Sequence, residues 1–188
     1  AANITVLILG SSGYYIEAGV LAILARLKIL VLFPINAIEP IIRRAYFKFS
    51  EGSSFDNLNN FNKAYINLIT FYLCSLITFI IINSEIIIIF IFGNDYLYIN
   101  SFMIIYLFII LINIFIRIST YLYHANNDTK KLGYFNFIFE VLLLILLVIF
   151  VPDEIMGFKL FGFGIMGDLY VKYIISLLLF IFMVRYCN

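Results

Sequence analysis

Hydrophobic residues fall into five long stretches separated by short polar connections. The stretches cover residues 14–38, 64–92, 97–123, 134–151 and 165–184. Each stretch has close to or more than the roughly 20 residues that a helix needs to cross about 30 Å of hydrocarbon. Runs of β-branched residues such as 86–89 are typical of strands in water, but lipid leaves the edge of an open sheet unpaired. The pattern therefore predicts five transmembrane helices, the first reaching about residue 42, in an all-α polytopic membrane protein.

Composition agrees with this interpretation. The chain is 64% hydrophobic and 12% charged, whereas a soluble domain has about 25% charged residues. We therefore expect membrane lipids and no nucleic acid as partners. Residues 1–9 are apolar but too short to span, and no basic segment precedes them as in a signal peptide. We interpret them as the end of a preceding helix, and the chain as a fragment.

Lysine and arginine fall almost entirely on alternate connections. One set of connections, together with the C-terminus, carries Arg43, Arg44, Lys48, Lys63, Lys130, Lys131 and Arg185. The other set carries Lys159 alone. Because cytoplasmic loops are enriched in basic residues, the first set is predicted to be cytoplasmic. The C-terminus is then cytoplasmic as well.

The residue types used for catalysis and metal binding are sparse. Cys74 and Cys187 have neither metal-ligand spacing nor a plausible disulfide geometry, and the single histidine, His124, has no catalytic companions. We expect no cofactor, no metal and no enzymatic activity. Three glycines at the entry to the last span are interpreted as close-packing positions: Gly162, Gly164 and Gly167.

Two cations lie inside the first span. Each of Arg26 and Lys28 costs about 2.5–3.5 kcal/mol on insertion scales, so each should face protein or water. Residues two apart on a helix point roughly 200° away from each other. Arg26 shares its face with Gly19 and Ala22, which favours a cavity, whereas Lys28 is expected to snorkel. The alternative for Arg26 is neutralisation by a carboxylate on a neighbouring helix.

Two prolines, Pro34 and Pro40, flank the cytoplasmic half of the same helix. Each removes a backbone donor and introduces a ring clash, so they are candidate hinge residues. The alternative is that proline is simply more frequent in membrane helices than in soluble ones.

The remaining charges within the spans are candidates for structural or coupling roles. Arg117 and Glu140 lie at matched depth on consecutive spans, which predicts a salt bridge, with ligand contact as the alternative. Asp168 and Lys172 are four residues apart and are expected to pair along one helix face. Glu85 lies near the outer end of the second span, where it is expected to reach Lys172 or water, with ion coupling as a further alternative.

Several segments, taken in order, resemble a known family. They are Glu39-Pro40-Ile41-Ile42-Arg43-Arg44, Ile91-Phe92-Gly93-Asn94-Asp95-Tyr96, Tyr123-His124-Ala125-Asn126-Asn127-Asp128 and Phe161-Gly162-Phe163-Gly164. The chain resembles the polysaccharide and O-antigen flippases of the multidrug, oligosaccharidyl-lipid and polysaccharide exporter superfamily. The resemblance implies two six-helix lobes, with this chain forming most of one lobe and a missing N-terminal lobe as its partner. The acidic pair at residues 153–154 departs from the family pattern.

The resemblance also implies a function. A lipid-linked oligosaccharide would cross the cytoplasmic membrane by alternating access, with Arg26 first, and Lys28 and Arg117 next, as substrate-binding candidates. Three alternatives stay open. A drug or cation antiporter would use Glu140 or Glu85 as a titrating carboxylate. An integral-membrane polymerase or acyltransferase would require His124 or an acid pair. A scaffold subunit would use none of these charges.

Overall fold

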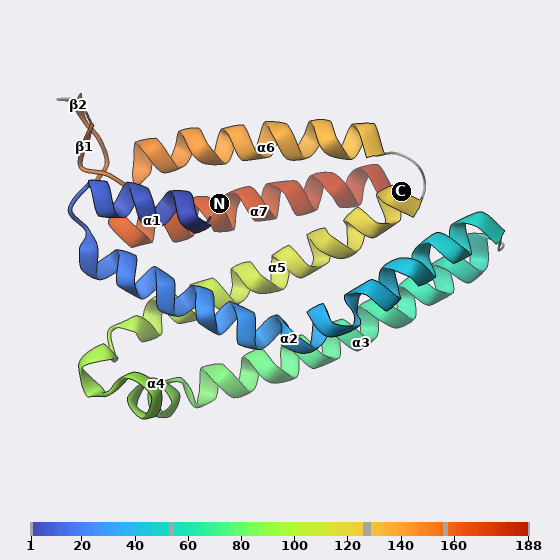
Figure 1. The fold of residues 1–188 in the computed structure, drawn as a ribbon, viewed down its shortest axis with the longest axis horizontal. Helices are drawn as coiled ribbons and strands as arrows, with labels where there is room; N and C mark the ends of the chain where they lie inside the picture. The colour runs from blue at the N-terminus through green and yellow to red at the C-terminus, as the bar shows by residue number, and fades with distance from the viewer. Residues whose placement is uncertain (1, 53–54, 126–128, 156–157, 188) are drawn as a thin grey trace.

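The computed structural model describes residues 2–52, 55–125, 129–155 and 158–187, which form an elongated helical bundle (Figure 1). The helices are α1 (Ala2–Ser11), α2 (Tyr15–Gly52), α3 (Phe55–Ile82), α4 (Ser84–Phe92), the 3-10 turn η1 (Asn94–Tyr96), α5 (Ile99–Ala125), α6 (Thr129–Phe150) and α7 (Gly164–Cys187). Two-residue strands β1 (Glu154–Ile155) and β2 (Phe158–Lys159) pair antiparallel, with Glu154 opposite Lys159. The all-α fold predicted from the hydrophobic pattern is confirmed.

Five helices are long and apolar enough to cross a bilayer, as predicted. The candidate spans are Tyr15–Lys48, Asn57–Ile82, Ile99–Ala125, Thr129–Phe150 and Gly164–Arg185. Many of their large apolar side chains are exposed; Phe71, for example, is 77% exposed. In water such a surface would aggregate, whereas in a membrane it contacts lipid chains. The chain is a multi-pass membrane protein.

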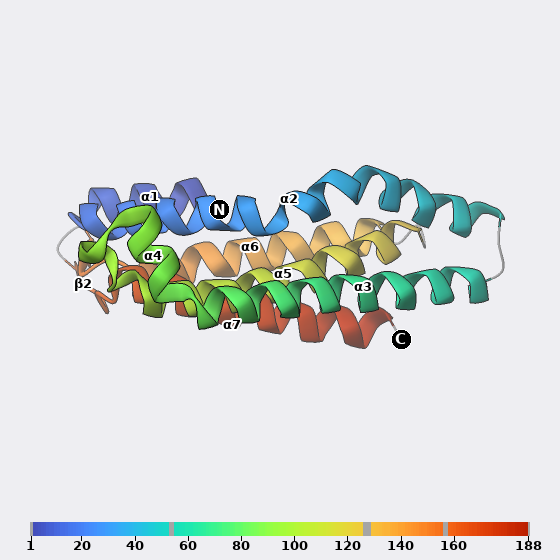
Figure 2. The ribbon, with the colours of Figure 1, turned by 90° about the horizontal axis from the view of Figure 1, so that it is seen from below.

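Helix α5 forms the centre of the bundle. It packs most extensively against α7 and α2, and also contacts α3 and α6. Its fully buried residues Leu107, Ile110 and Ile114 recur every three or four positions, which places them on one helix face. Figure 2 shows the bundle edge on, with α1 and α2 along one side and α3 and α7 along the other.

The ends of the helices separate into two groups. In Figure 1 the α2–α3 tip, the end of α5 and the C-terminal end of α7 lie toward one end of the bundle. The α1–α2 turn, α4 and the β1–β2 pair lie at the opposite end. The alternation of connections expected from the basic residues is therefore present in the fold.

The second hydrophobic stretch is not the single helix predicted for residues 64–92. It breaks at Asn83 into α3 and α4, and the Asn83 side-chain amide donates a hydrogen bond to the Phe79 carbonyl at 2.9 Å. The backbone N–H of Asn83 also donates to the Phe79 carbonyl, at 3.1 Å. With nine residues, α4 is about 14 Å long and too short to span. Glu85 therefore lies on a separate short helix, where it is exposed.

Helices α2 and α3 are longer than the hydrophobic pattern predicted. Residues 43–63 were expected to form a connection, but helix continues to Gly52 and resumes at Phe55. The 38 residues of α2 correspond to about 57 Å, nearly twice the hydrocarbon thickness. Neither glycine nor proline interrupts residues 41–51, so nothing in that segment ends the helix. The basic residues of this segment are carried on helical extensions.

A carboxylate joins the start of α2 to the start of α7. Glu17, in the first turn of α2, accepts a hydrogen bond from the backbone N–H of Ile165. The carboxylate thus stabilises the positive ends of two helix dipoles at once. Gly164 has φ of +53°, and a Cβ there would lie 2.1 Å from Glu17 Oε2. Gly167 is also closely packed, because a Cβ added there would lie 2.7 Å from the Phe150 carbonyl oxygen. The close-packing interpretation of the glycines is confirmed.

Replacing Gly164 by alanine is expected to destabilise the protein by about 1–3 kcal/mol, because a left-handed conformation is strained for any side chain. The added methyl group also displaces the Glu17 carboxylate. Gly133→Ala in α6 is the matched control, since a Cβ added there would meet nothing within 4 Å. Thermal unfolding in detergent should show a lower midpoint for Gly164→Ala alone. Equal midpoints for the two variants would contradict the assignment.

The hydroxyl of Tyr14 lies at the same end of the bundle. It is 3.5 Å from the Gly162 carbonyl oxygen and also within hydrogen-bond reach of the Asp153 carboxylate. A hydroxyl has one hydrogen, and a charged acceptor makes the stronger bond, so the bond to Asp153 dominates. This bond, partial burial and the negative charges of Asp153 and Glu17 raise the pKa of Tyr14 to about 12.

The raised pKa of Tyr14 gives a pH-dependent contribution to stability. Tyr14 is protonated in both the folded and unfolded states below pH 10, so the hydrogen bond stabilises the fold fully there. The contribution is lost as pH rises from about 10 to about 12. The difference in melting temperature between wild type and Tyr14→Phe should therefore shrink over that interval. A difference that stays constant to pH 12 would contradict the bond to Asp153.

Candidate functional site

A polar cavity lies between the membrane-spanning helices α2, α5, α6 and α7. Its volume is about 200 Å³. The polar lining residues are Lys28, Asn113, Asn136, Glu140, Lys172 and Ser176. Helices in lipid do not expose this many polar groups unless they face a water-filled or ligand-filled space. The cavity is therefore the first candidate site.

Lys28 lines this cavity and does not follow the prediction that it would only snorkel along an apolar face. Its side chain is half-buried, and among the described residues it forms no hydrogen bond or ion pair. The charges that act most strongly on it are two further cations, Arg117 and Lys172. A spacing of two residues places Arg26 and Lys28 on opposite faces of α2. Spacing alone does not identify which of the two faces is covered by neighbouring helices.

The predicted pair between Asp168 and Lys172 is confirmed. Lys172 Nζ lies 2.7 Å from Asp168 Oδ1 and 2.8 Å from Oδ2. The Asp168 side chain is fully buried, and the Thr5 hydroxyl of α1 also donates to it. A buried carboxylate requires such compensation, because its desolvation penalty is several kcal/mol. The pair lies within α7, and its Lys172 lines one wall of the cavity.

The predicted salt bridge between Arg117 and Glu140 is wrong. Arg117 Nη1 lies 3.2 Å from Glu39 Oε2 and 2.7 Å from Asn36 Oδ1, both on α2. Glu140 is exposed at the cavity rim and forms no ion pair within the described part of the chain. Arg117, on α5, faces α2 instead of α6. Arg117 therefore joins α5 to α2.

Glu39 is the centre of a network that the sequence interpretation missed. Besides Arg117, it accepts hydrogen bonds from Tyr121 Oη at 2.6 Å and Arg43 Nη2 at 2.9 Å. The guanidinium of Arg43 also lies 5.6 Å from the centre of the Tyr121 ring. The sequence did contain one signal, since Glu39 and Arg43 are an acid-first pair four residues apart. The network joins α2 to α5.

Arg26 lies on the opposite side of α2 from the cavity. It is exposed, together with Gly19 and Ala22 on the same face, and none of the described residues forms a hydrogen bond or ion pair with it. It lies eleven residues after the start of the Tyr15–Lys48 span, or about 17 Å along the helix, which is close to the middle of a bilayer whose hydrocarbon begins at Tyr15. The described helices therefore leave an arginine uncovered at mid-membrane depth.

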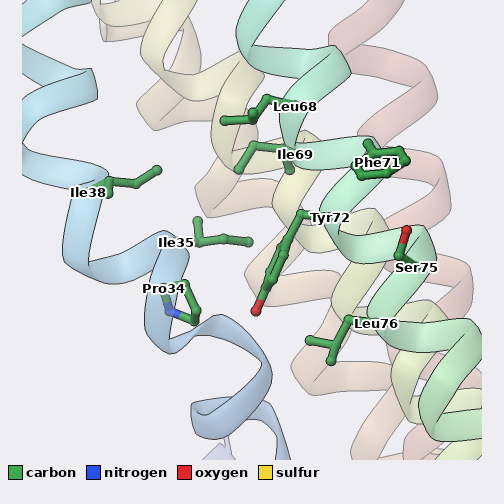
Figure 3. A pocket seen from close by; sticks show the side chains of 9 residues that line it. All are labelled: Pro34, Ile35, Ile38, Leu68, Ile69, Phe71, Tyr72, Ser75 and Leu76. Atoms are coloured by element: carbon green, nitrogen blue, oxygen red, sulfur yellow. The ribbon is translucent and has the colours of Figure 1, made fainter.

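Pro34 and Pro40 both lie within α2, as predicted for hinge candidates. Next to Pro34, the Tyr72 hydroxyl of α3 donates a hydrogen bond to the Val31 carbonyl at 3.2 Å, across an apolar groove of about 590 Å³ (Figure 3). A proline removes a backbone hydrogen bond from its helix. Backbone carbonyl groups near the proline therefore accept hydrogen bonds from neighbouring helices. The groove between α2 and α3 is otherwise lined almost entirely by hydrocarbon.

The other candidates are not brought together. Glu85 is exposed on α4, and the described carboxylate paired with Lys172 is Asp168. Among the described residues, no group of three His, Cys, Asp or Glu side chains is arranged to hold a metal ion. Cys74 is an exposed free thiol. His124 lies in the last turn of α5, and residues 126–128, which complete the predicted small and basic segment, lie outside the described residues.

The chain matches no family model, no curated protein and no solved structure.

Proposed function

We propose that the chain forms most of one lobe of a flippase that moves a lipid-linked oligosaccharide across the cytoplasmic membrane by alternating access. The exposed Arg26 at mid-membrane depth is the observation that carries this proposal. The C-terminus is cytoplasmic in the proposed orientation, following the excess of basic residues at that end. The partner is a second lobe facing the Arg26 side of α2.

An arginine facing hydrocarbon at this depth is costly, so the Arg26 face requires a polar covering. A second lobe set against α2 across a water-filled lumen supplies one. The small residues Gly19 and Ala22 leave room beside the guanidinium. This arrangement supports transport, because a lumen at the interface between two lobes is the usual place for a transporter's substrate site.

The charge of Arg26 favours an anionic substrate. A guanidinium binds phosphate oxygens in a bidentate manner, and its charge acts more strongly away from bulk water. A lipid-linked sugar carries such a phosphate at the junction between its head group and its tail. The saccharide would cross through the lumen while the hydrocarbon tail stays in the bilayer. The resemblance in segment order to flippases of polysaccharide precursors supports the same substrate class.

A drug or cation antiporter is the second candidate, and the exposed, unpaired Glu140 at the cavity rim favours it. Such an antiporter needs a carboxylate that exchanges protons with water. It predicts that export of a cationic dye depends on a pH gradient and on Glu140. A lipid flippase predicts no such dependence on that carboxylate for dye transport.

One reconstitution experiment separates the two candidates. The complete two-lobed protein is placed in proteoliposomes that contain a lipid-linked oligosaccharide in the inner leaflet. Exposure of the sugar to an external glycosidase, above the level in protein-free vesicles, is the expected result. Dye export driven by a pH gradient without sugar exposure would replace the flippase proposal with the antiporter.

A further inference from the structure

The cavity between α2, α5, α6 and α7 contains hydrogen-bonding groups that the protein itself leaves unused. Within the described part of the chain, Lys28, Asn136 and Ser176 have no hydrogen-bond partner. Asn113 donates one amide hydrogen to the Ile109 carbonyl at 2.9 Å and retains a second. The polar atoms of these residues are accessible from the cavity and are not among the buried atoms that lack a partner, so water or a bound ligand supplies the missing bonds.

The unused groups are mainly donors. A lysine ammonium has three hydrogens and no acceptor, so Lys28 offers three donors to the cavity. Lys172 lies within bonding distance of both Asp168 oxygens, 2.7 and 2.8 Å away, and keeps a third hydrogen. The amides and the hydroxyl add further donors from α5, α6 and α7. An acceptor-rich occupant satisfies this set best.

The electrostatic field in the cavity also favours an anion. Besides its burial, Lys28 is affected by the charges of Arg117 and Lys172, each of which is paired with a carboxylate. Asp168 and Glu39 are engaged with Lys172 and Arg117, and neither pairs with Lys28. Glu140 also lines the cavity, on its exposed side, and is the lining carboxylate that an anion would have to pass. An incoming anion would supply the charge that Lys28 lacks.

The size of the cavity limits the occupant. About 200 Å³ is less than the roughly 300–1,000 Å³ of pockets for drug-sized ligands, so a small ion fits better than a sugar chain. Ammonium, amide and hydroxyl donors arriving from four helices suit the several acceptor oxygens of a tetrahedral oxyanion. The site is also separate from the Arg26 face, since the two side chains point roughly 200° apart on α2.

We propose that this cavity binds one phosphate-class oxyanion, held by Lys28 and Lys172 with Asn113, Asn136 and Ser176 as neutral donors. The phosphate is either free inorganic phosphate or the phosphomonoester of a lipid head group that enters past Glu140. The two sources share the same recognition chemistry and differ in whether a hydrocarbon chain accompanies the anion. This site does not depend on the proposed lumen at Arg26.

The test uses the purified protein in a maltoside detergent, stripped of phospholipid. Isothermal titration is carried out with inorganic phosphate in one arm and with dioctanoyl phosphatidic acid in the other, with dioctanoylglycerol as the uncharged lipid control. At least one phosphate ligand should bind with unit stoichiometry. Binding of phosphatidic acid alone assigns the lipid source, and binding of inorganic phosphate assigns the free anion.

Variants identify the site. Lys28→Met should weaken the binding of phosphate by about tenfold or more, as expected when a charged donor is removed. Lys28→Arg should retain binding, and Asn136→Ala should weaken it less than Lys28→Met. Lys48→Gln removes the same charge from the exposed far end of α2 and should leave the phosphate affinity unchanged. Thermal unfolding midpoints show whether each variant is folded.

Three outcomes would overturn the proposal. They are the absence of binding in both arms, binding that Lys28→Met leaves unchanged in a folded protein, and equal weakening by Lys28→Met and Lys48→Gln. The last outcome would show a diffuse effect of net charge. Each of these results is independent of whether sugar exposure is observed in proteoliposomes, so this inference and the proposed function fail separately.

Discussion

Replacing Arg26 by glutamine is expected to lower delivery of the lipid-linked oligosaccharide to the outer leaflet by about tenfold or more, which corresponds to the loss of a charge-assisted hydrogen bond to phosphate. Protein abundance should stay near normal, because Arg26 is exposed and forms no bond with the described residues of its own chain. Delivery is measured as sugar exposed to an external glycosidase, normalised to protein in the membrane.

Two companion variants sharpen this experiment. Arg26→Lys keeps the charge but loses the planar fork, so it should retain part of the activity. Lys48→Gln removes a charge from the exposed far end of the same helical span, and delivery should remain close to that of wild type. Unchanged delivery in Arg26→Gln would remove Arg26 from the lumen and with it the main support for a flippase.

Replacing Lys172 by methionine is expected to destabilise the protein by about 3–5 kcal/mol, because it leaves the buried Asp168 carboxylate without its cation. The Asp168 side chain is fully buried and that of Lys172 is 14% exposed. Replacing both residues, as in Asp168→Leu with Lys172→Met, should recover most of the loss, since an apolar pair leaves no buried charge uncompensated. Unfolding in detergent gives the free energies.

The chain offers a matched pair as the control for that prediction. Glu39 and Arg43 are also an acid-first pair four residues apart, but the Arg43 side chain is 58% exposed. Arg43→Met should therefore change the free energy of unfolding by less than about 1 kcal/mol. If Lys172→Met and Arg43→Met lower the free energy of unfolding by similar amounts, burial is not the reason that the Asp168–Lys172 pair stabilises the protein.

The number of spans was predictable from the sequence because lipid imposes a simple rule of length and polarity. Each long apolar stretch contains one helix of membrane-spanning length, and the local pair Asp168–Lys172 followed from spacing along one helix. The break at Asn83 was not predictable from hydropathy, since Asn83 lies within an apolar stretch. The same side-chain bond to the carbonyl four residues earlier occurs at Asn113 inside the continuous helix α5, so it does not by itself explain the break.

Contacts between helices were harder to predict than the helices themselves. Arg117 and Glu140 were predicted to pair because they were expected to lie at the same depth in the membrane. Depth is only one of the coordinates that determine where a side chain lies in a helical bundle. The direction of Arg117 depends on how α5 rotates about its axis and on which helix lies beside it. In the structure α5 packs more extensively against α2 than against α6, and Arg117 meets Glu39 instead. The same uncertainty about rotation hid the role of Lys28 in the cavity.

The contact between Glu17 and the Ile165 backbone has a consequence for biosynthesis. The two residues are 148 positions apart, so Glu17 leaves the ribosome long before its partner has been translated. Until then its carboxylate must stay hydrated at the membrane surface, and the amide that it will cap does not exist. The final transmembrane segment therefore completes the assembly, and a nascent chain released before that segment has no means of closing this end of the bundle.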